Sequence, residues 1–238
     1  MELPHYAKRT MRHGEKKARL WPMYQRDYLM RMIEQAAQFI AQTVFKLKQE
    51  GKQEEAQAAL GELYQRFALP NRNLIRMISP DELVALLSQN DQPVLEKVTA
   101  AALILQEEGH IAVLGSQPET ASFSYGRSLH LWLTAYIANT DESVRTHIET
   151  VLTQLTSSDI HDQTKILLMG YQVRCGNYAE AENILYRFSN QMDSATLLDI
   201  GVNFYLDLQK KDDSELQAGQ LPRNELHDGL VQWRERKL

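Results

Sequence analysis

The chain has 238 residues, of which 43% are hydrophobic and 24% charged, and its formal net charge at pH 7 is −5. These values are typical of a folded globular protein and exclude collagen-like and highly charged disordered chains. The single cysteine, Cys175, excludes a disulfide or a cysteine-based zinc site within one chain, so we expect a reducing, cytoplasmic setting. The longest apolar run, residues 129–138, is about half a membrane span, so no membrane partner is expected.

The first 22 residues differ from the rest in charge. Residues 1–22 carry a net charge of +4, and residues 23–238 carry −9. Pro4, Gly14 and Pro22 interrupt any regular element, so this leader is predicted to be basic and disordered. Its six cations could contact nucleic-acid phosphates, but the acidic remainder would repel a polyanion, which makes this the weakest functional hypothesis.

An amphipathic helix is predicted to follow the leader and to end at Gly51. Its apolar residues recur about every 3.6 positions, at Leu29, Ile33, Ala36, Ile40, Val44 and Leu47. Gly51 suits the left-handed cap, and a second helix is predicted from Gln53 to Phe67. The short connection predicts an antiparallel hairpin.

The segment SPDELVALL, residues 79–87, contains a helix start, because Ser79 and Glu82 can form a capping box around Pro80. The next helix is predicted from Pro93 to Glu108, stopping at Gly109, with residues 110–119 forming an irregular loop.

The remaining chain also shows helical periodicity. Helices are predicted at residues 120–138, 141–155, 159–174, 178–189 and 193–209 and from Pro222 onward. Thr140 and Asp193 are expected to cap two of them, Gly176 to form a hairpin bend, and residues 211–221 to form a loop or linker. About nine or ten helices and no segment of period two predict an all-α fold.

Two hairpins share a pattern. GKQEEAQAALGELYQRF, residues 51–67, and GNYAEAENILYRF, residues 176–188, align Ala56 with Ala181. A small residue there lets the second helix approach the first closely. GNYAEA resembles the G-x-Y-x-x-A core of the tetratricopeptide repeat. That resemblance implies antiparallel hairpins stacked as a superhelix over residues 23–210, with residues 211–238 as a linker and a C-terminal helix packed on the array.

A second resemblance concerns DYLMRMIEQAAQFIAQTVF, residues 27–45, together with SPDEL, residues 79–83. These segments are similar to a family of uncharacterised bacterial cytoplasmic proteins, a domain of unknown function. The resemblance implies no catalytic residue, and it suggests that the native chain starts at Met23.

No phosphate-binding loop, nucleophile elbow or zinc helix motif is present. Three weaker groups hold possible ligands: Glu107, Glu108 and His110; His147 and Glu149; and Asp159, His161 and Asp162. Each is more simply explained as a solvated helix end, so we expect no metal and no cofactor. Cys175 beside Arg174 is expected to be a buried structural thiol.

The richest aromatic cluster comprises Arg127, His130, Trp132 and Tyr136. Trp132 and Tyr136 share a helix face and could line a groove, with Arg127 available to a carboxylate. The alternative is a core role, because helical arrays bury aromatic residues between their layers.

The fold favours a protein-interaction scaffold that binds a protein or peptide partner or a second copy of itself. An enzyme or small-ligand binder, with a site made of separated Arg, His and Glu residues, is the alternative. It would be favoured if several of Arg127, His130, His147 and His161 met in one pocket, whereas their scatter over separate faces would favour the scaffold.

Overall fold

The computed structural model describes residues 31, 34–156, 160–188 and 194–235. The predicted leader, residues 1–22, lies outside these residues, as do Leu29, Ile33, Asp159 and Asp193. No helix of the described residues combines the length and apolarity needed to cross a bilayer.

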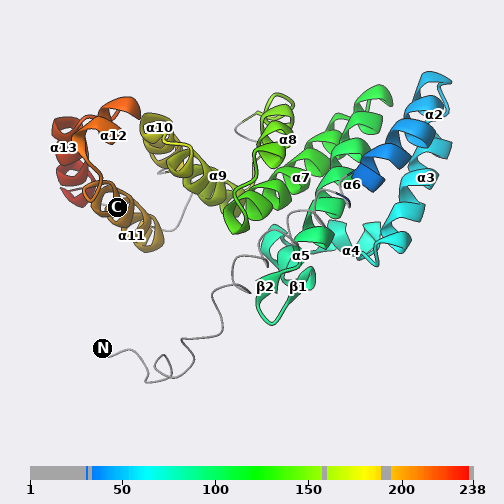
Figure 1. The fold of residues 1–238 in the computed structure, drawn as a ribbon, viewed down its shortest axis with the longest axis horizontal. Helices are drawn as coiled ribbons and strands as arrows, with labels where there is room; N and C mark the ends of the chain where they lie inside the picture. Colours follow the sequence, from blue (N-terminus) through cyan, green and yellow to red (C-terminus); the bar gives the residue numbers. More distant parts are fainter. Residues whose placement is uncertain (1–30, 32–33, 157–159, 189–193, 236–238) are drawn as a thin grey trace, which may run out of the picture.

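The described chain contains twelve α-helices, a π-helical turn and two very short strands (Figure 1). In chain order they are η1 (Ile40–Val44), α2 (Phe45–Gln49), α3 (Gln53–Arg66), α4 (Arg72–Met77), α5 (Pro80–Leu86), β1 (Ser88–Gln89), β2 (Gln92–Pro93), α6 (Leu95–Leu114), α7 (Pro118–Ala138), α8 (Glu142–Leu152), α9 (Asp162–Arg174), α10 (Tyr178–Phe188), α11 (Ser194–Leu208), α12 (Asp213–Ala218) and α13 (Arg223–Glu235). The predicted all-α class is confirmed.

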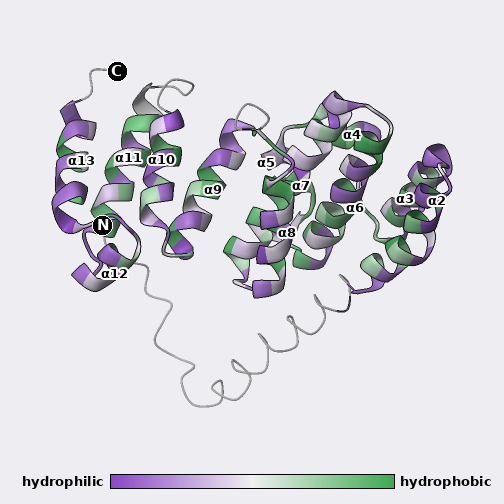
Figure 2. Cartoon of the chain, turned by 90° about the horizontal axis from the view of Figure 1, so that it is seen from above, coloured by the Kyte–Doolittle hydropathy of each residue, from purple (hydrophilic) through white to green (hydrophobic). Residues whose placement is uncertain are grey.

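The helices form an elongated row from α2 at one end to α13 at the other (Figures 1 and 2). Successive helices contact one another along it: α3 packs on α6, α6 on α7, α7 on both α8 and α9, α9 on α10, and α11 on α13. The central helices α6 and α7 therefore bury apolar residues against neighbours on more than one side.

The first predicted hairpin is confirmed. Ala36, Ile40 and Val44 are buried as the periodicity predicts, and the turn of η1 is continuous with α2. Gly51 follows with a φ of 73°, in the left-handed region that glycine adopts without a side-chain clash.

The second predicted hairpin joins α9 and α10. Gly176 has a φ of 77°, and the N–H of Asn177 donates to the carbonyl of Gln172, which closes the helix end. Ala181 and its counterpart Ala56 are both fully buried. Gly176 is therefore a bend between two packed helices.

The prediction for Gly109 is wrong. Helix α6 continues through it to Leu114, so the expected loop at residues 110–119 is reduced to the short connection around Gly115 and Ser116. A Cβ atom at Gly109 would lie 2.6 Å from Cε1 of Tyr125 on α7. The glycine therefore permits a close helix contact, and the Ser128 hydroxyl of α7 donates to the Ala102 carbonyl of α6 at 2.7 Å nearby.

Helix α6 is buried around most of its circumference. Its buried residues run from Val98 to Ala112, because α3 covers one side and α7 the other. A helix enclosed in this way is expected to be apolar all round, which hides the amphipathic pattern from the sequence.

Other differences are local. Residues 211–221 contain α12, capped by Asp212, whose carboxylate accepts from the Glu215 N–H. Asp141, and not Thr140, caps α8 by accepting from the Ser143 N–H. Two elements have no counterpart in the predictions: α4, capped by Asn71, and the antiparallel β1–β2 pair. Asn90 and Asp91 between the strands both have positive φ, as a tight hairpin turn requires.

Candidate functional site

A pocket of about 440 Å³ lies where α5, α7 and the start of α9 meet. We call it the α7 pocket, and its lining residues are Pro80, Pro118, Glu119, Ser122, Phe123, Gly126, Arg127 and His161. Six of them come from the first three turns of α7 and recur with a spacing of three or four, so they share one helix face. The pocket combines apolar rings with two basic groups and one carboxylate.

Arg127 is the residue predicted for carboxylate binding, and it lines this pocket. Its guanidinium carbon lies 5.1 Å above the Phe123 ring, and Nη2 donates to the Ile78 carbonyl. Nη1 is buried and has no hydrogen-bond partner among the described residues. Burial lowers the pKa of Arg127, and the nearby charge of Glu82 opposes that shift.

His161 reaches the same pocket from the N-terminus of α9. It is exposed, and its Nδ1 accepts from the Gln163 N–H at 3.4 Å as the helix cap. The neutral ring must then carry its proton on Nε2. The α7 pocket therefore has two hydrogen-bond donors of basic type, Arg127 and His161.

Beside the pocket, His130 is buried between Asp81 and Thr164. Its Nε2 lies 3.3 Å from Oδ1 of Asp81, and its Nδ1 lies 3.0 Å from the Thr164 hydroxyl. Burial, together with the positive charges of Arg127 and His161, lowers the pKa of His130 to about 4. The ring is therefore neutral at pH 7, and accepts from Thr164 while donating towards Asp81.

This Asp–His–Thr order has the geometry of a nucleophilic relay. Thr164, however, is fully buried and His130 is 1% exposed, so no substrate atom can reach the hydroxyl in this structure. The relay consequently acts as a buried link between α5, α7 and α9.

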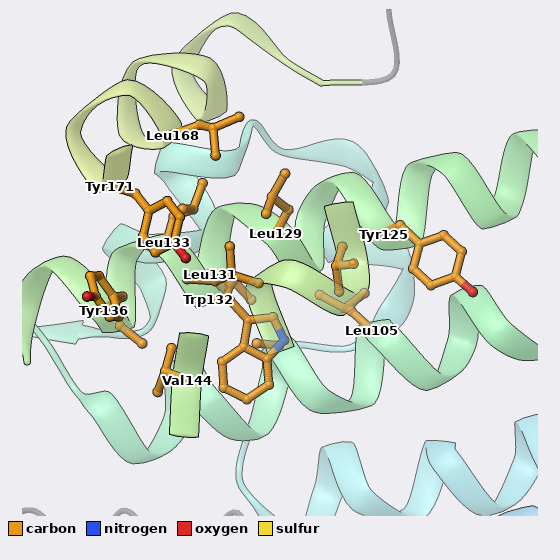
Figure 3. Packing of buried hydrophobic residues seen from close by; sticks show 14 of the residues in the cluster. Leu105, Tyr125, Leu129, Leu131, Trp132, Leu133, Tyr136, Val144, Leu168 and Tyr171 are labelled. Atoms are coloured by element: carbon orange, nitrogen blue, oxygen red, sulfur yellow. The ribbon is translucent and has the colours of Figure 1, made fainter. Parts of the chain in front are cut away.

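Trp132 lies on the side of α7 that faces α8, near Val144 (Figure 3). Its Nε1 donates to Oε1 of Gln106 at 3.1 Å, and its ring stacks on His147 with centroids 4.3 Å apart. Nδ1 of His147 is 3.2 Å from the same Gln106 oxygen. Trp132 is fully buried and joins α6, α7 and α8.

Tyr136 is also buried, one turn further along α7 (Figure 3). Its ring meets Tyr171 edge-on at 5.0 Å, and its hydroxyl is 3.7 Å from Sγ of Cys175. Cys175 itself is half-buried, more exposed than predicted. The four predicted groove residues thus do not lie together: Arg127 lines the pocket, and the other three are core residues.

The acidic run on α6 is divided between two ion pairs. Glu107 lies 3.1 Å from Nζ of Lys48 and 2.9 Å from Nδ1 of His110. Glu108 instead pairs with Arg72 at 2.6 Å. Since the two carboxylates serve different partners, Glu107, Glu108 and His110 do not converge, and the described residues contain no group of three potential metal ligands.

Of the four residues whose convergence would favour an enzyme, two share the pocket. Arg127 and His161 line it, His130 is buried beside it, and His147 lies with Trp132 on the α8 side. The two basic groups of the pocket give it the chemistry to bind an anionic group.

Sequence reasoning missed the residues that shape the pocket. Glu119 and Phe123 precede Arg127 by eight and four residues, a signal of one shared helix face. Pro80 is predicted only as a helix-start residue, and Pro118 falls in the irregular loop expected at residues 110–119, whereas it begins α7. No local signal shows that three separate helices meet here.

These features define an all-helical protein whose helices form a long row, with a pocket on one side that contains both basic and acidic side chains. A family model described as a family of unknown function, DUF6483, matches residues 23–237, so the chain belongs to that family. No curated protein and no solved structure matches the chain. The membership confirms the predicted uncharacterised family, whereas the tetratricopeptide resemblance stays a prediction.

Proposed function

We propose that this chain is a protein-interaction scaffold that binds a segment of a protein or peptide partner on the face formed by α5, α7 and α9. The observation that carries the proposal is the α7 pocket, whose volume of about 440 Å³ holds one or two side chains of a partner. Its walls offer both apolar contact and hydrogen bonding, the combination found at binding sites.

Two further features favour a scaffold of tetratricopeptide-like type. The hairpins α2–α3 and α9–α10 each bend at a left-handed glycine and bury the equivalent alanine, Ala56 or Ala181. Stacked hairpins of this kind present extended surfaces to partners. As part of the proposal, residues 23–210 form the array, residues 211–238 close it, and the protein works in a bacterial cytoplasm.

A pocket-filling substitution tests the proposal. Ser122→Trp places a large ring in the α7 pocket, and Gln232→Trp adds the same ring to the exposed face of α13 as a matched control. Cross-linked partners captured from the native host by the tagged full chain are quantified by mass spectrometry. We expect Ser122→Trp to deplete a reproducible partner that Gln232→Trp retains; equal capture by both variants would contradict the pocket as the binding site.

A second copy of the chain is the competing partner. Light scattering of the purified protein and of the Ser122→Trp variant distinguishes it. If the unmodified protein is a dimer and the Ser122→Trp variant is a monomer, the partner is a second copy of the chain. If both are monomers, the partner is a different protein.

A further inference from the structure

We infer that the α7 pocket recognises a single carboxylate on a peptide segment, held by Arg127 and His161. The inference rests on the proposed function, because it specifies the chemistry that the bound partner must present. The carboxylate can belong to an aspartate or glutamate side chain or to a peptide C-terminus.

The first argument is the state of the Arg127 guanidinium. Nη2 donates a hydrogen bond to the Ile78 carbonyl, and the guanidinium group lies over the Phe123 ring. Nη1 is buried and has no hydrogen-bond partner among the described residues. A buried donor left unsatisfied is unfavourable, and a carboxylate is the strongest acceptor that can satisfy it. Because Nη1 is covered in this structure, carboxylate binding requires the side chain to turn towards the ligand as the ligand enters.

The second argument is the tautomer of His161. Its Nδ1 is occupied by the Gln163 N–H, so Nε2 carries a proton that the cap does not use. Both this group and Arg127 line the same pocket, and Ser122 adds a hydroxyl. A carboxylate has two oxygens and can accept from two of these donors at once.

The third argument concerns which anions are rejected. Glu119 lines the pocket, Glu82 lies close enough to affect the pKa of Arg127, and Asp81 contacts the buried His130 next to it. These carboxylates repel a phosphate dianion or a nucleic-acid backbone. A ligand segment with one negative charge, flanked by neutral or basic residues, therefore fits the two basic groups and the nearby carboxylates of the pocket best.

The apolar lining indicates what flanks the carboxylate. Pro80, Pro118 and Phe123 form walls without charged groups. Aliphatic residues on either side of the acidic group can bury surface against them. The expected ligand is therefore an acidic residue between apolar ones, or an apolar C-terminus.

Matched peptides test this directly on the full chain. The first is an acetylated, amidated pentapeptide with a central glutamate flanked by leucines, and the second has glutamine in its place. The third has leucine at the centre and a free C-terminal carboxylate, and a fourth has phosphoserine at the centre. Binding is followed by NMR through the side-chain Nε–Hε signal of Arg127 and by calorimetry.

We expect the glutamate peptide, the free-carboxylate peptide or both to shift the Arg127 signal, and the glutamine peptide to bind at least about tenfold more weakly. The stronger of the two carboxylate peptides identifies the source of the group. Tighter binding of the phosphoserine peptide, or no shift with either carboxylate at millimolar concentration, would overturn the inference.

Variants supply the second readout. Arg127→Gln should weaken binding at least about tenfold, and Arg127→Lys less, because lysine keeps the charge but loses the planar fork. Arg234→Gln removes an exposed cation from α13 and should leave binding unchanged. Circular dichroism checks that each variant is folded. If Ser122→Trp loses the captured partner but Arg127→Gln retains it, carboxylate recognition by Arg127 is refuted. The proposal that the α7 pocket binds a protein partner would still hold.

Discussion

Gly109 of α6 lies against the ring of Tyr125 of α7, so closely that a methyl group on the glycine would stand 2.6 Å from Cε1. This contact lies between the two longest α-helices of the described residues, on which α3, α5, α8 and α9 pack. The spacing of the whole centre of the row therefore depends on a residue without a side chain.

Substitution of this glycine should be destabilising. Gly109→Ala forces Tyr125 or the helix axis to move, and we expect a loss of about 1–3 kcal/mol in the free energy of unfolding. Gly61→Ala on α3 is the matched control, because a Cβ there has nothing within 4 Å. Since alanine favours helix, this control should gain up to about 1 kcal/mol. Urea unfolding of both variants measures the difference, and equal stabilities would contradict the proposed contact.

The ion pairs of Glu107 should contribute to stability. Burial raises its pKa, but the hydrogen bond and charge of His110, together with Lys48, outweigh burial and leave the pKa below its ordinary value. Glu107→Gln leaves Lys48 without its charged partner, and we expect a loss of about 2 kcal/mol at pH 7.

The control for this prediction is Glu149→Gln on α8. Glu149 pairs with Arg145 at 2.9 Å, but both side chains are substantially exposed. Its loss should cost less than about 1 kcal/mol because solvent screens exposed pairs. Chemical unfolding at pH 7 compares the two. If Glu107→Gln were no more destabilising than Glu149→Gln, the α2–α6 ion pair would have no special role.

His130 should make the protein less stable in acid. Its pKa is about 4 in the folded state, against an ordinary value of 6.5, so the unfolded chain binds a proton that the folded chain excludes between these pH values. Stability from this residue is complete above pH 6.5 and is lost as the pH falls towards 4. The shift corresponds to about 3 kcal/mol over that window.

The variant His130→Asn should show a flatter stability profile between pH 6.5 and 4 than the unmodified protein. His227→Asn, at an exposed position of α13, should keep the original slope. Unfolding by urea at several pH values gives the three profiles. An unchanged slope in His130→Asn would mean that the buried ring does not control this transition.

The sequence correctly predicted those helix ends that are determined by residues within one short segment. Gly176 marks a helix end because the left-handed bend is a property of that residue, and the Ser79–Glu82 capping box forms within four residues. Gly109 looks the same in sequence, but its role is set by Tyr125, which belongs to another helix. The prediction there failed because local signals do not reveal the partner.

In the candidate site, too, some residues have a local sequence signal and others are brought in only by the packing of distant helices. Arg127 is predicted from its type and helix position to be available to a carboxylate, and it lines the α7 pocket. His161 and Pro80 join it only because α5, α7 and α9 pack together, and such contacts between distant segments leave no periodic signal. Trp132 and Tyr136 share a face of α7, but that face is covered by neighbouring helices.

The most direct measurement is hydrogen–deuterium exchange of the full chain with and without its captured partner. We predict that protection on binding is concentrated in peptides covering residues 80–86, 118–127 and 161–174, the segments that form the α7 pocket. We expect no such protection in Ser122→Trp. Protection confined to other helices, or the same protection in the pocket-filled variant, would contradict the claim that this pocket is where the protein binds its partner.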